Sequence, residues 1–441
     1  MNNNRSEGEF FGTEPVGKIL LKIAPPVMLA QLIQAMYNIV DSFFVGNYSD
    51  EALTALAVIF PIQFIIAALA IGTGTGVNIY MANRYALNRK KTAEHTAGTG
   101  TALAVVTWAV FALVSALLMR PYVMTSAKTP LAVEYAVIYG NIVCIGSLAA
   151  FLEGNWTKIH QARGNMRRPM IAQVIGALIN IILDPFLIFG IGFFPEMGVA
   201  GAAIATVLGQ IAAAAITCAG AVKKPPKFKV MLSCAQKIYR FGYPSIMMQA
   251  LYTVYIVALN IILAGFSDSA VTVLGLYYKM QSFFFIPLFG LQTCIVPVIS
   301  FNYAQESYER CKDIMRDTFL ICMAFMSVGI VCFVFFPDFV IGLFSHSAEV
   351  HEIGNVAFPI IGLSFISAVF SLIMPVFFQA IGSGVKSLML SLTRQIFCLL
   401  PSFWLFLLIG LNYAWIAFPV SETIAGGIGL ILYFRQVQKW K

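Results

Sequence analysis

Long apolar runs constrain this chain more than any other feature of its sequence. The runs are separated by short polar segments, and none alternates polar and apolar residues with a period of two. A helix of about 20 apolar residues spans a bilayer core and satisfies all its backbone hydrogen bonds internally. Because 59% of the residues are hydrophobic and only 11% charged, lipid is the expected solvent. The sequence predicts an all-α polytopic membrane protein with twelve spans: 18–46, 52–82, 95–119, 131–157, 170–194, 199–222, 239–264, 270–300, 314–336, 353–380, 388–410 and 413–435.

The basic residues favour one orientation of these spans. With the N-terminus in the cytoplasm, all but three of the 28 Lys and Arg lie in cytoplasmic segments; the others are Arg120 and Lys128 in external loops and Lys279 inside a span. Cytoplasmic loops of membrane proteins carry such an excess of positive charge. We therefore expect a multi-pass protein of the plasma (cytoplasmic) membrane, in contact with lipid and with both termini cytoplasmic. The net charge of +8 then indicates no nucleic-acid partner.

The two halves of the chain match at one constant offset without a gap. Matched pairs include Pro26 and Pro244, Gln31 and Gln249, Tyr37 and Tyr255, Gln63 and Gln281, and Gly72 and Gly290. Six spans per half predict two six-helix lobes related by a pseudo-two-fold axis along the membrane normal, as in transporters that alternate access. We expect an N-lobe over 1–222, a cytoplasmic linker over 223–238 and a C-lobe over 239–441.

Polar residues share one face of the first span. They stand at i, i+3, i+4 and i+7: Gln34, Tyr37, Asn38 and Asp41. A charge at the bilayer centre costs about 2.5–3.5 kcal/mol, so an acid there needs a reason. The pattern favours the lining of a wet cavity with Asp41 as a cation ligand. The alternative is a helix-end carboxylate that reaches the outer interface.

A second acid stands inside the fifth span. Asp184 shares a helical face with Asn180 and Gln173, and Pro185 removes a helical hydrogen bond beside it. If Asp41 and Asp184 face one cavity, the pair would bind a proton, a sodium ion or an organic cation, but not all at once. Mutual exclusion of this kind is the physical basis of antiport. The alternative is a proline kink that Asp184 caps.

Further polar residues extend the candidate set into both halves. Thr206 in the sixth span and Asn155 at the end of the fourth add to the first half, although a buried Thr often bonds its own backbone. Asn260, Lys279 and Gln281 are cavity candidates in the second half, and Lys279 would serve equally as half of a structural ion pair. Because no acid stands at the second-half position that matches Asp41, cation coupling is expected in the first half. Two further charged residues stand near the ends of predicted spans. We expect Arg394 on the cytoplasmic side and Glu422 at the membrane interface.

Several classes of chemistry lack a motif here. No Walker sequence is present, and the eight cysteines form no CxxC or Cys/His cluster, so neither ATP hydrolysis nor a structural metal site is indicated. A membrane-embedded transferase would need clustered acids for Mg²⁺, which the sequence also lacks. We expect no enzyme activity and no cofactor, with H⁺ or Na⁺ as the coupling ion.

Four segments resemble the multidrug and toxic compound extrusion (MATE) family. They are PPVMLAQLIQAMYNIVDSFFVG, NIILDPFLIFG, GVAGAAIATVLGQ and CIVPVISFNYAQ, and the pattern Asn180–Asp184–Pro185 with Asp41 is similar to the bacterial DinF-like and MepA-like branch. The resemblance covers nearly the whole chain. It implies an antiporter that exports small organic cations and amphipathic drugs against an inward H⁺ or Na⁺ gradient, and we expect this protein to be a monomer. Its ion site would carry over to Asp41, Asn180, Asp184 and Thr206.

Movement is expected where the first span contains Pro26, with Pro185 as a second hinge. Two alternatives of the same superfamily stay open, a flippase for lipid-linked precursors and an exporter of one metabolite. A flippase for an anionic headgroup would need several basic residues in its cavity, and Lys279 is the one candidate identified.

Overall fold

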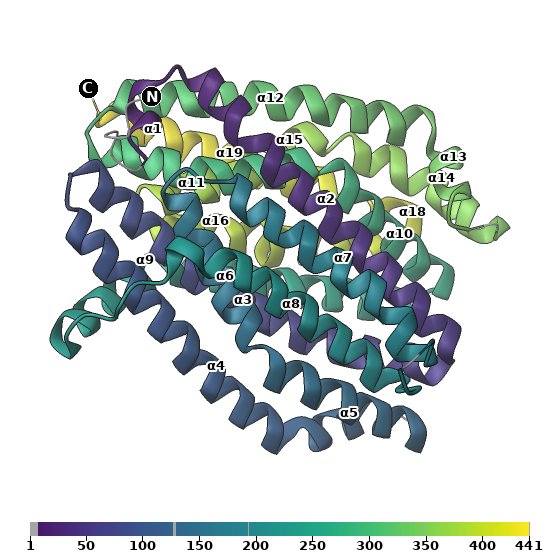
Figure 1. The fold of residues 1–441 in the computed structure, drawn as a ribbon. Coiled ribbons are helices and arrows are strands. Elements are labelled where there is room, and N and C mark those ends of the chain that lie inside the picture. The colour runs from purple at the N-terminus through teal and green to yellow at the C-terminus, as the bar shows by residue number, and fades with distance from the viewer. Residues whose placement is uncertain (1–7, 127–128, 193, 346, 441) are drawn as a thin grey trace. The chain divides into compact units, whose positions relative to one another are not determined.

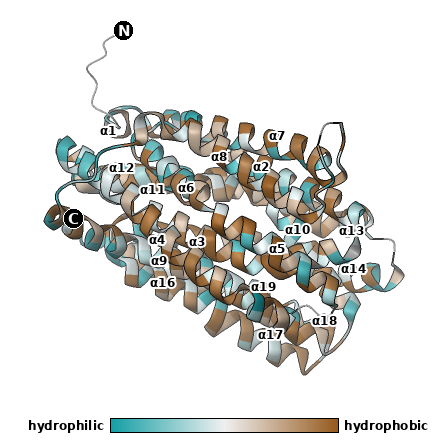
Figure 2. Cartoon of the chain, turned by 60° about the horizontal axis from the view of Figure 1, so that its bottom comes forward, coloured by the Kyte–Doolittle hydropathy of each residue, from teal (hydrophilic) through white to brown (hydrophobic). Residues whose placement is uncertain are grey.

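The computed structural model is all-helical over the residues that it describes, which are 8–126, 129–192, 194–345 and 347–440. Lys128, counted above in an external loop, lies outside them. Ten helices in these ranges are long and apolar enough to cross a membrane, and two bent helix pairs raise the number to twelve (Figure 1). Apolar residues cover most of their length in Figure 2. The predicted fold class, an all-α polytopic membrane protein, is confirmed.

The chain divides into two compact units. The first contains Met1–Thr13 and Pro25–Ile246, and the second contains Glu14–Ala24 and Met247–Lys441. Helix α2 therefore begins in the second unit and continues in the first from Pro25, whereas α9 does the reverse after Ile246. The helices up to this point are α1 (Phe10–Thr13), α2 (Val16–Tyr48), α3 (Asp50–Ala86), α4 (Lys90–Ser126), α5 (Pro130–Gly146), α6 (Leu148–Ala162), α7 (Arg167–Phe189), α8 (Val199–Ala221) and α9 (Phe228–Ala264).

The second unit repeats this order of long and bent helices. A π-helical turn, η1, interrupts one of its spans between α16 and α17. Its elements are α10 (Asp268–Phe284), α11 (Ile286–Ala304), α12 (Tyr308–Phe335), α13 (Pro337–Gly342), α14 (Ala348–Gly362), α15 (Phe365–Ala380), α16 (Gly384–Leu392), η1 (Thr393–Leu399), α17 (Leu400–Leu407), α18 (Leu411–Ala414) and α19 (Ala417–Gln438).

Serine residues in corresponding places cap and bend corresponding helices of the two halves. Ser49 caps α3 by accepting a hydrogen bond from Ala52 N, and Ser267, at the matching position of the repeat, caps α10 in the same way. The pair α5–α6 bends by 44° at Ser147, and the pair α14–α15 bends by 56° beside Ser364. In both, the buried serine hydroxyl donates to the carbonyl three residues earlier, which draws the backbone away from straight helical geometry.

The segment between the two halves is shorter than the sequence indicated. The basic stretch over 223–238 was expected to be a linker, but α9 begins at Phe228 and is helical from there onward. The first half of α9 packs tightly in the first unit: a Cβ on Gly76 of α3 would lie 2.0 Å from the Ile238 carbonyl oxygen. Most of the expected linker is thus part of a helix that continues into the second unit.

Candidate functional site

The structure brings Asp41 and Asp184 together in the first unit. Asp41 on α2 is 8% exposed and Asp184 on α7 is fully buried. Their side chains lie within hydrogen-bonding reach of each other. One oxygen of each carboxyl group, Oδ1, has no hydrogen-bond partner among the described residues. The pair therefore has unused ligand atoms pointing into a buried region.

Asn180 and Thr206 flank this acid pair. Asn180 lies one helical turn before Asp184. In the amide orientation that satisfies both of its ends, the Asn180 nitrogen donates to Asp184 Oδ2 at 3.3 Å, and its oxygen accepts from the backbone N–H of Thr206 on α8 at 3.0 Å. The Tyr37 hydroxyl of α2 lies close to Thr206. All four residues predicted for cation coupling thus form one buried cluster, with Tyr37 beside it.

Two members of the cluster were not predicted from the sequence as site residues. Tyr139 on α5 is 1% exposed and accepts a hydrogen bond from Gln63 Nε2 on α3 at 3.3 Å, and its hydroxyl lies close to Thr206. Gln63 had been noted as a repeat position, since it matches Gln281. That recurrence of a polar residue in an apolar helix was the available signal.

Close packing fixes the geometry of the two helices α7 and α8. A Cβ on Gly209 would lie 2.6 Å from the Gly176 carbonyl oxygen and 3.2 Å from Asn180 Cβ. Because both positions are glycine, the two backbones approach closely enough for Asn180 to meet Thr206. Pro185 lies inside α7 and Pro26 inside α2, so both predicted hinges are within helices, and their hinge role stays a prediction.

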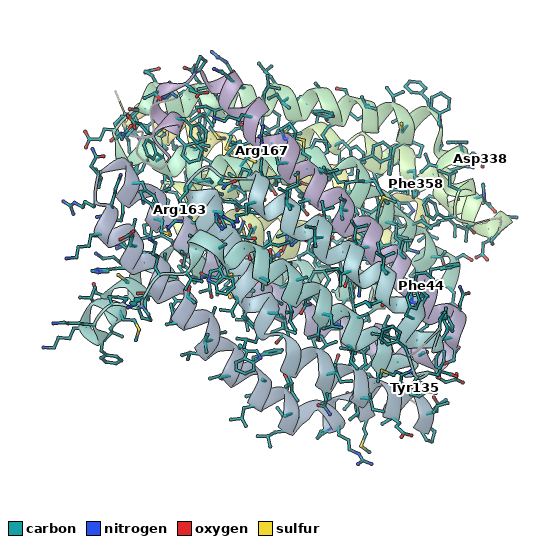
Figure 3. All side chains as sticks on the ribbon, in the orientation of Figure 1. Phe44, Tyr135, Arg163, Arg167, Asp338 and Phe358 are labelled. Carbon is teal, nitrogen blue, oxygen red and sulfur yellow. The ribbon has the colours of Figure 1, made fainter. Side chains whose placement is uncertain are left out.

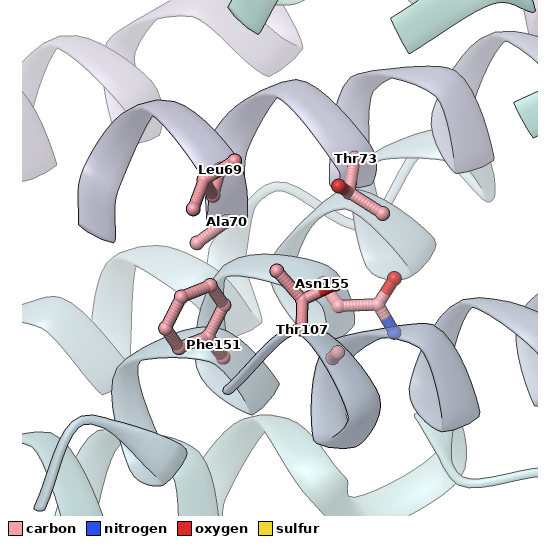
Figure 4. A pocket seen from close by; sticks show the side chains of 7 residues that line it. Leu69, Ala70, Thr73, Thr107, Phe151 and Asn155 are labelled. Carbon is pink, nitrogen blue, oxygen red and sulfur yellow. The ribbon is translucent and has the colours of Figure 1, made fainter. Parts of the chain in front are cut away.

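Other predicted residues of the first half lie in different surroundings. Gln173 donates to Glu153 Oε1 at 3.4 Å, and Asn155 donates to Thr101 Oγ1 at 3.4 Å. Asn155 and neighbouring side chains of α3, α4 and α6 line a narrow gap that has no room for a water molecule (Figure 4). On α2, Asn38 is exposed and Gln34 half-buried. No described contact joins these four to the acid cluster.

The second-half candidates are not gathered into a comparable cluster among the described residues. Lys279 is exposed, Asn260 is half-buried and Gln281 is 9% exposed. Their assignment as cavity residues stays a prediction.

Two charged residues were placed wrongly from the sequence. Arg394, counted with the cytoplasmic charges, is 8% exposed inside the span formed by α16, η1 and α17. Glu422, expected at an interface, is 7% exposed on α19 and accepts a hydrogen bond from Arg394 Nη1 at 2.8 Å. Each residue lies well inside a span, where the partner on another helix allows both charges to be buried.

These features define a helical membrane protein made of two related halves, with a buried polar site in the first half. The family comparison names its group. The MatE family model matches residues 26–186 and again 244–405, so its two matched segments begin at Pro26 and at Pro244, which are partners in the repeat, and the chain belongs to the MatE family. The resemblance seen in the sequence is confirmed, and the chain is a member of a family of multidrug efflux transporters.

Named relatives match most of the chain. It is 25% identical over 370 residues to "Probable multidrug resistance protein NorM" of Thermotoga maritima, covering 79% of this chain and 76% of that protein. It is 24% identical over 424 residues to an FAD transporter of Shewanella oneidensis, covering 93% of each. It is 22% identical to the multidrug export protein MepA of Staphylococcus aureus, covering 96% of this chain and 95% of that one.

Solved structures share the fold. A crystal structure of a MATE protein in complex with MaL6 superposes with a TM-score of 0.91 over 99% of both chains, at 22% sequence identity. The helical order described above is therefore that of a known transporter architecture.

Proposed function

We propose that this protein is a secondary antiporter that exports cationic or amphipathic small molecules in exchange for inward H⁺, with Na⁺ as the alternative coupling ion. The observation that carries the proposal is the contact between Asp41 and Asp184 in a buried cluster. Two carboxylates in a low-dielectric region repel each other when both are ionised, so the pair favours the binding of one cation between them. A proton, a sodium ion or a cationic substrate would each meet that need.

The neighbouring groups suit the exchange of such a cation. Asn180 and Thr206 hold the Asp184 side, and Tyr37 and Tyr139 supply hydroxyl groups that donate or accept hydrogen bonds. The unpartnered Oδ1 atoms of both acids offer ligand positions. When a cation enters, it would draw α2 and α7 together, and its departure would let them separate. Occupancy by the coupling ion would then exclude a cationic substrate.

The direction and place of transport follow from the same reasoning. We propose export across the plasma membrane by a monomer with both termini in the cytoplasm, since the basic residues gather on that side. The relatives named as multidrug resistance and multidrug export proteins support an outward direction and a broad substrate class.

A second candidate is the export of one native metabolite. The relative named as an FAD transporter matches 93% of the chain, a larger share than the NorM relative matches. FAD carries phosphates rather than a positive charge, so for that substrate the acid pair would serve the coupling ion alone. Transport of FAD and of a cationic dye by the same preparation would separate the two candidates.

The test is efflux from bacterial cells that lack their own pumps. We expect wild type to lower cellular ethidium, and we expect Asp41→Asn and Asp184→Asn each to abolish that effect at equal expression. Glu352→Gln, which neutralises an exposed acid of α14, serves as the matched control and should retain efflux. A protonophore should stop efflux if H⁺ is coupled, and removal of Na⁺ should stop it if Na⁺ is coupled. Efflux that survives both Asp substitutions would contradict the proposed site.

A further inference from the structure

The second unit buries a complete ion pair. Arg394 in the π-helical turn η1 donates to Glu422 Oε1 at 2.8 Å, and Ser371 on α15 donates to the other carboxylate oxygen. The relative exposures of Arg394, Glu422 and Ser371 are 8%, 7% and 2%. Both carboxylate oxygens are therefore satisfied, and the net charge of the group is zero.

The surroundings leave Arg394 as the cation that balances Glu422. Besides each other, Arg394 and Glu422 interact electrostatically with three phenols, and phenols are uncharged near neutral pH. Lys386 on α16 bonds Gln436 on α19 instead. The three phenols come from α9 and α10: Tyr252, Tyr255 and Tyr277.

The repeat shows that this acid is particular to the second half. The pattern of α8 recurs 212 residues later at α18–α19, an offset six residues shorter than that between Pro26 and Pro244. Four positions are identical at this offset: Gly198 and Gly410, Ala202 and Ala414, Ile204 and Ile416, and Ala205 and Ala417. By the same spacing, Gln210 of the first half corresponds to Glu422. Asp41 in turn corresponds to Leu259, at the offset that pairs Pro26 with Pro244. Each half thus holds a buried acid where the other half is neutral.

The two acid sites differ in what compensates their charge. In the first unit, Asp41 and Asp184 face each other, and a mobile cation is the available counter-charge. In the second unit, the counter-charge is a guanidinium fixed to the chain, which keeps its proton under all physiological conditions. A proton or sodium ion would have to displace a tethered cation that is always present.

We propose that Arg394 confines cation coupling to the first unit by acting as the permanent counter-ion of Glu422. The π-helical turn places Arg394 against Glu422 of α19, and such turns are frequent at functional positions. Without the guanidinium, Glu422 is a second buried acid that binds a cation during each transport cycle. This inference rests on the proposed antiport and adds the residue that sets its cation stoichiometry.

The experiment measures the number of cations exchanged per substrate. The full chain is reconstituted in vesicles, and a proton or sodium gradient of known size is imposed. The ethidium gradient at which net transport stops is then measured. Arg394→Gln should raise the number by one cation per substrate. Arg394→Lys keeps the charge and should leave the number unchanged. The double variant Arg394→Gln with Glu422→Gln removes both charges and should restore the wild-type number.

A folded Arg394→Gln protein with wild-type stoichiometry would overturn the inference, as would an altered stoichiometry in the double variant. If Arg394→Gln does not fold, infrared difference spectra of wild type and of the double variant test whether Glu422 takes up a proton during transport. Carboxyl protonation bands during substrate exchange should be the same in both, because Glu422 never takes up the coupling proton; loss of part of the band in the double variant would contradict this. If wild type shows no cation-coupled transport, the proposed function itself fails. If wild type is coupled and Arg394→Gln has the wild-type stoichiometry, only this further inference fails.

Discussion

Each unit buries acidic side chains inside the protein, but the two units surround these acids in opposite ways. Asp41 and Asp184 place two acidic groups next to each other, whereas Arg394 and Glu422 bring opposite charges into contact. If both acids of the first unit are ionised, they need an added cation to balance their charge. The acid of the second unit is already balanced by Arg394. Under the proposed antiport, the first half would carry the coupling site and the second half a structural ion pair, although both share one helical order.

The packing of the helices follows the same division. In the first unit, α7 and α8 approach through Gly176 and Gly209, so no charged group is needed to join them. In the second unit, η1 and α19 are joined by the Arg394–Glu422 hydrogen bond. The glycine contact involves no charged side chain, whereas in the second unit the contact between η1 and α19 is made by two charged side chains that neutralise each other.

The largest effect should come from breaking the ion pair asymmetrically. Glu422→Gln leaves a buried guanidinium that cannot lose its proton, and we expect a loss of about 3–5 kcal/mol in stability. Arg394→Gln should cost less, since Glu422 can take up a proton and become neutral. Thermal unfolding of the detergent-purified protein measures both. The double Gln variant is the control and should be nearer to wild type than Glu422→Gln. Equal losses for the two single variants would contradict the asymmetry.

The next largest effect should come from the glycine contact. Gly209→Ala places a methyl group 2.6 Å from the Gly176 carbonyl oxygen and beside Asn180, so α7 and α8 must separate. We expect a loss of about 1–3 kcal/mol, the usual cost of overpacking, together with loss of ethidium efflux. Gly427→Ala on α19 is the matched control, because a Cβ there meets nothing within 4 Å. A Gly209→Ala protein with normal efflux would show that the Asn180–Thr206 spacing is not critical.

Much of this comparison could be predicted from the sequence, because its signals are local or periodic. Apolar run length indicated twelve spans, and the constant offset between matched residues indicated two related halves. Helical spacing placed Asn180 and Asp184 on one face, and the structure joins them with Asp41 and Thr206. In each case the relevant spacing is a property of one helix or of one repeat.

The ion pair could not be recognised in this way, since its partners are 28 residues apart on different elements. Arg394 stands in an apolar run, TRQIFCLLPSFW, but hydropathy alone does not show whether a charge there turns toward a partner or toward an interface. Tyr139 and Gln63, 76 residues apart, present the same difficulty. Side-chain pairing between helices depends on how the helices pack, which periodicity does not determine.

A smaller effect is expected from the hydroxyl network around the acid pair. Tyr139→Phe removes a buried hydroxyl that contacts Gln63 and Thr206, while the ring keeps its packing. We expect a loss of about 0.5–1.5 kcal/mol and reduced but measurable efflux. Tyr122→Phe is the control: its hydroxyl donates to the Val58 carbonyl at 2.9 Å, outside the acid cluster, and its loss should leave efflux unchanged. Equal efflux defects in the two variants would mean that Tyr139 has no particular part in the site.

The smallest effect should come from an acid–base pair exposed to water. Asp338 on α13 accepts hydrogen bonds from His351 at 2.6 Å and from Asn355 at 3.1 Å, and these bonds lower the pKa of Asp338 (Figure 3 labels this residue). A carboxyl group with a lowered folded-state pKa stabilises the protein above its unfolded-state value, about 3.9, and loses that contribution as the pH falls. Asp338→Asn should therefore lower the melting temperature slightly at neutral pH, and the difference from wild type should vanish in acid. Because the Asp338 side chain is 72% exposed, solvent screening keeps this pair weak, in contrast to Arg394–Glu422. A melting-temperature loss as large as that of Glu422→Gln would show that burial is not what distinguishes the two pairs.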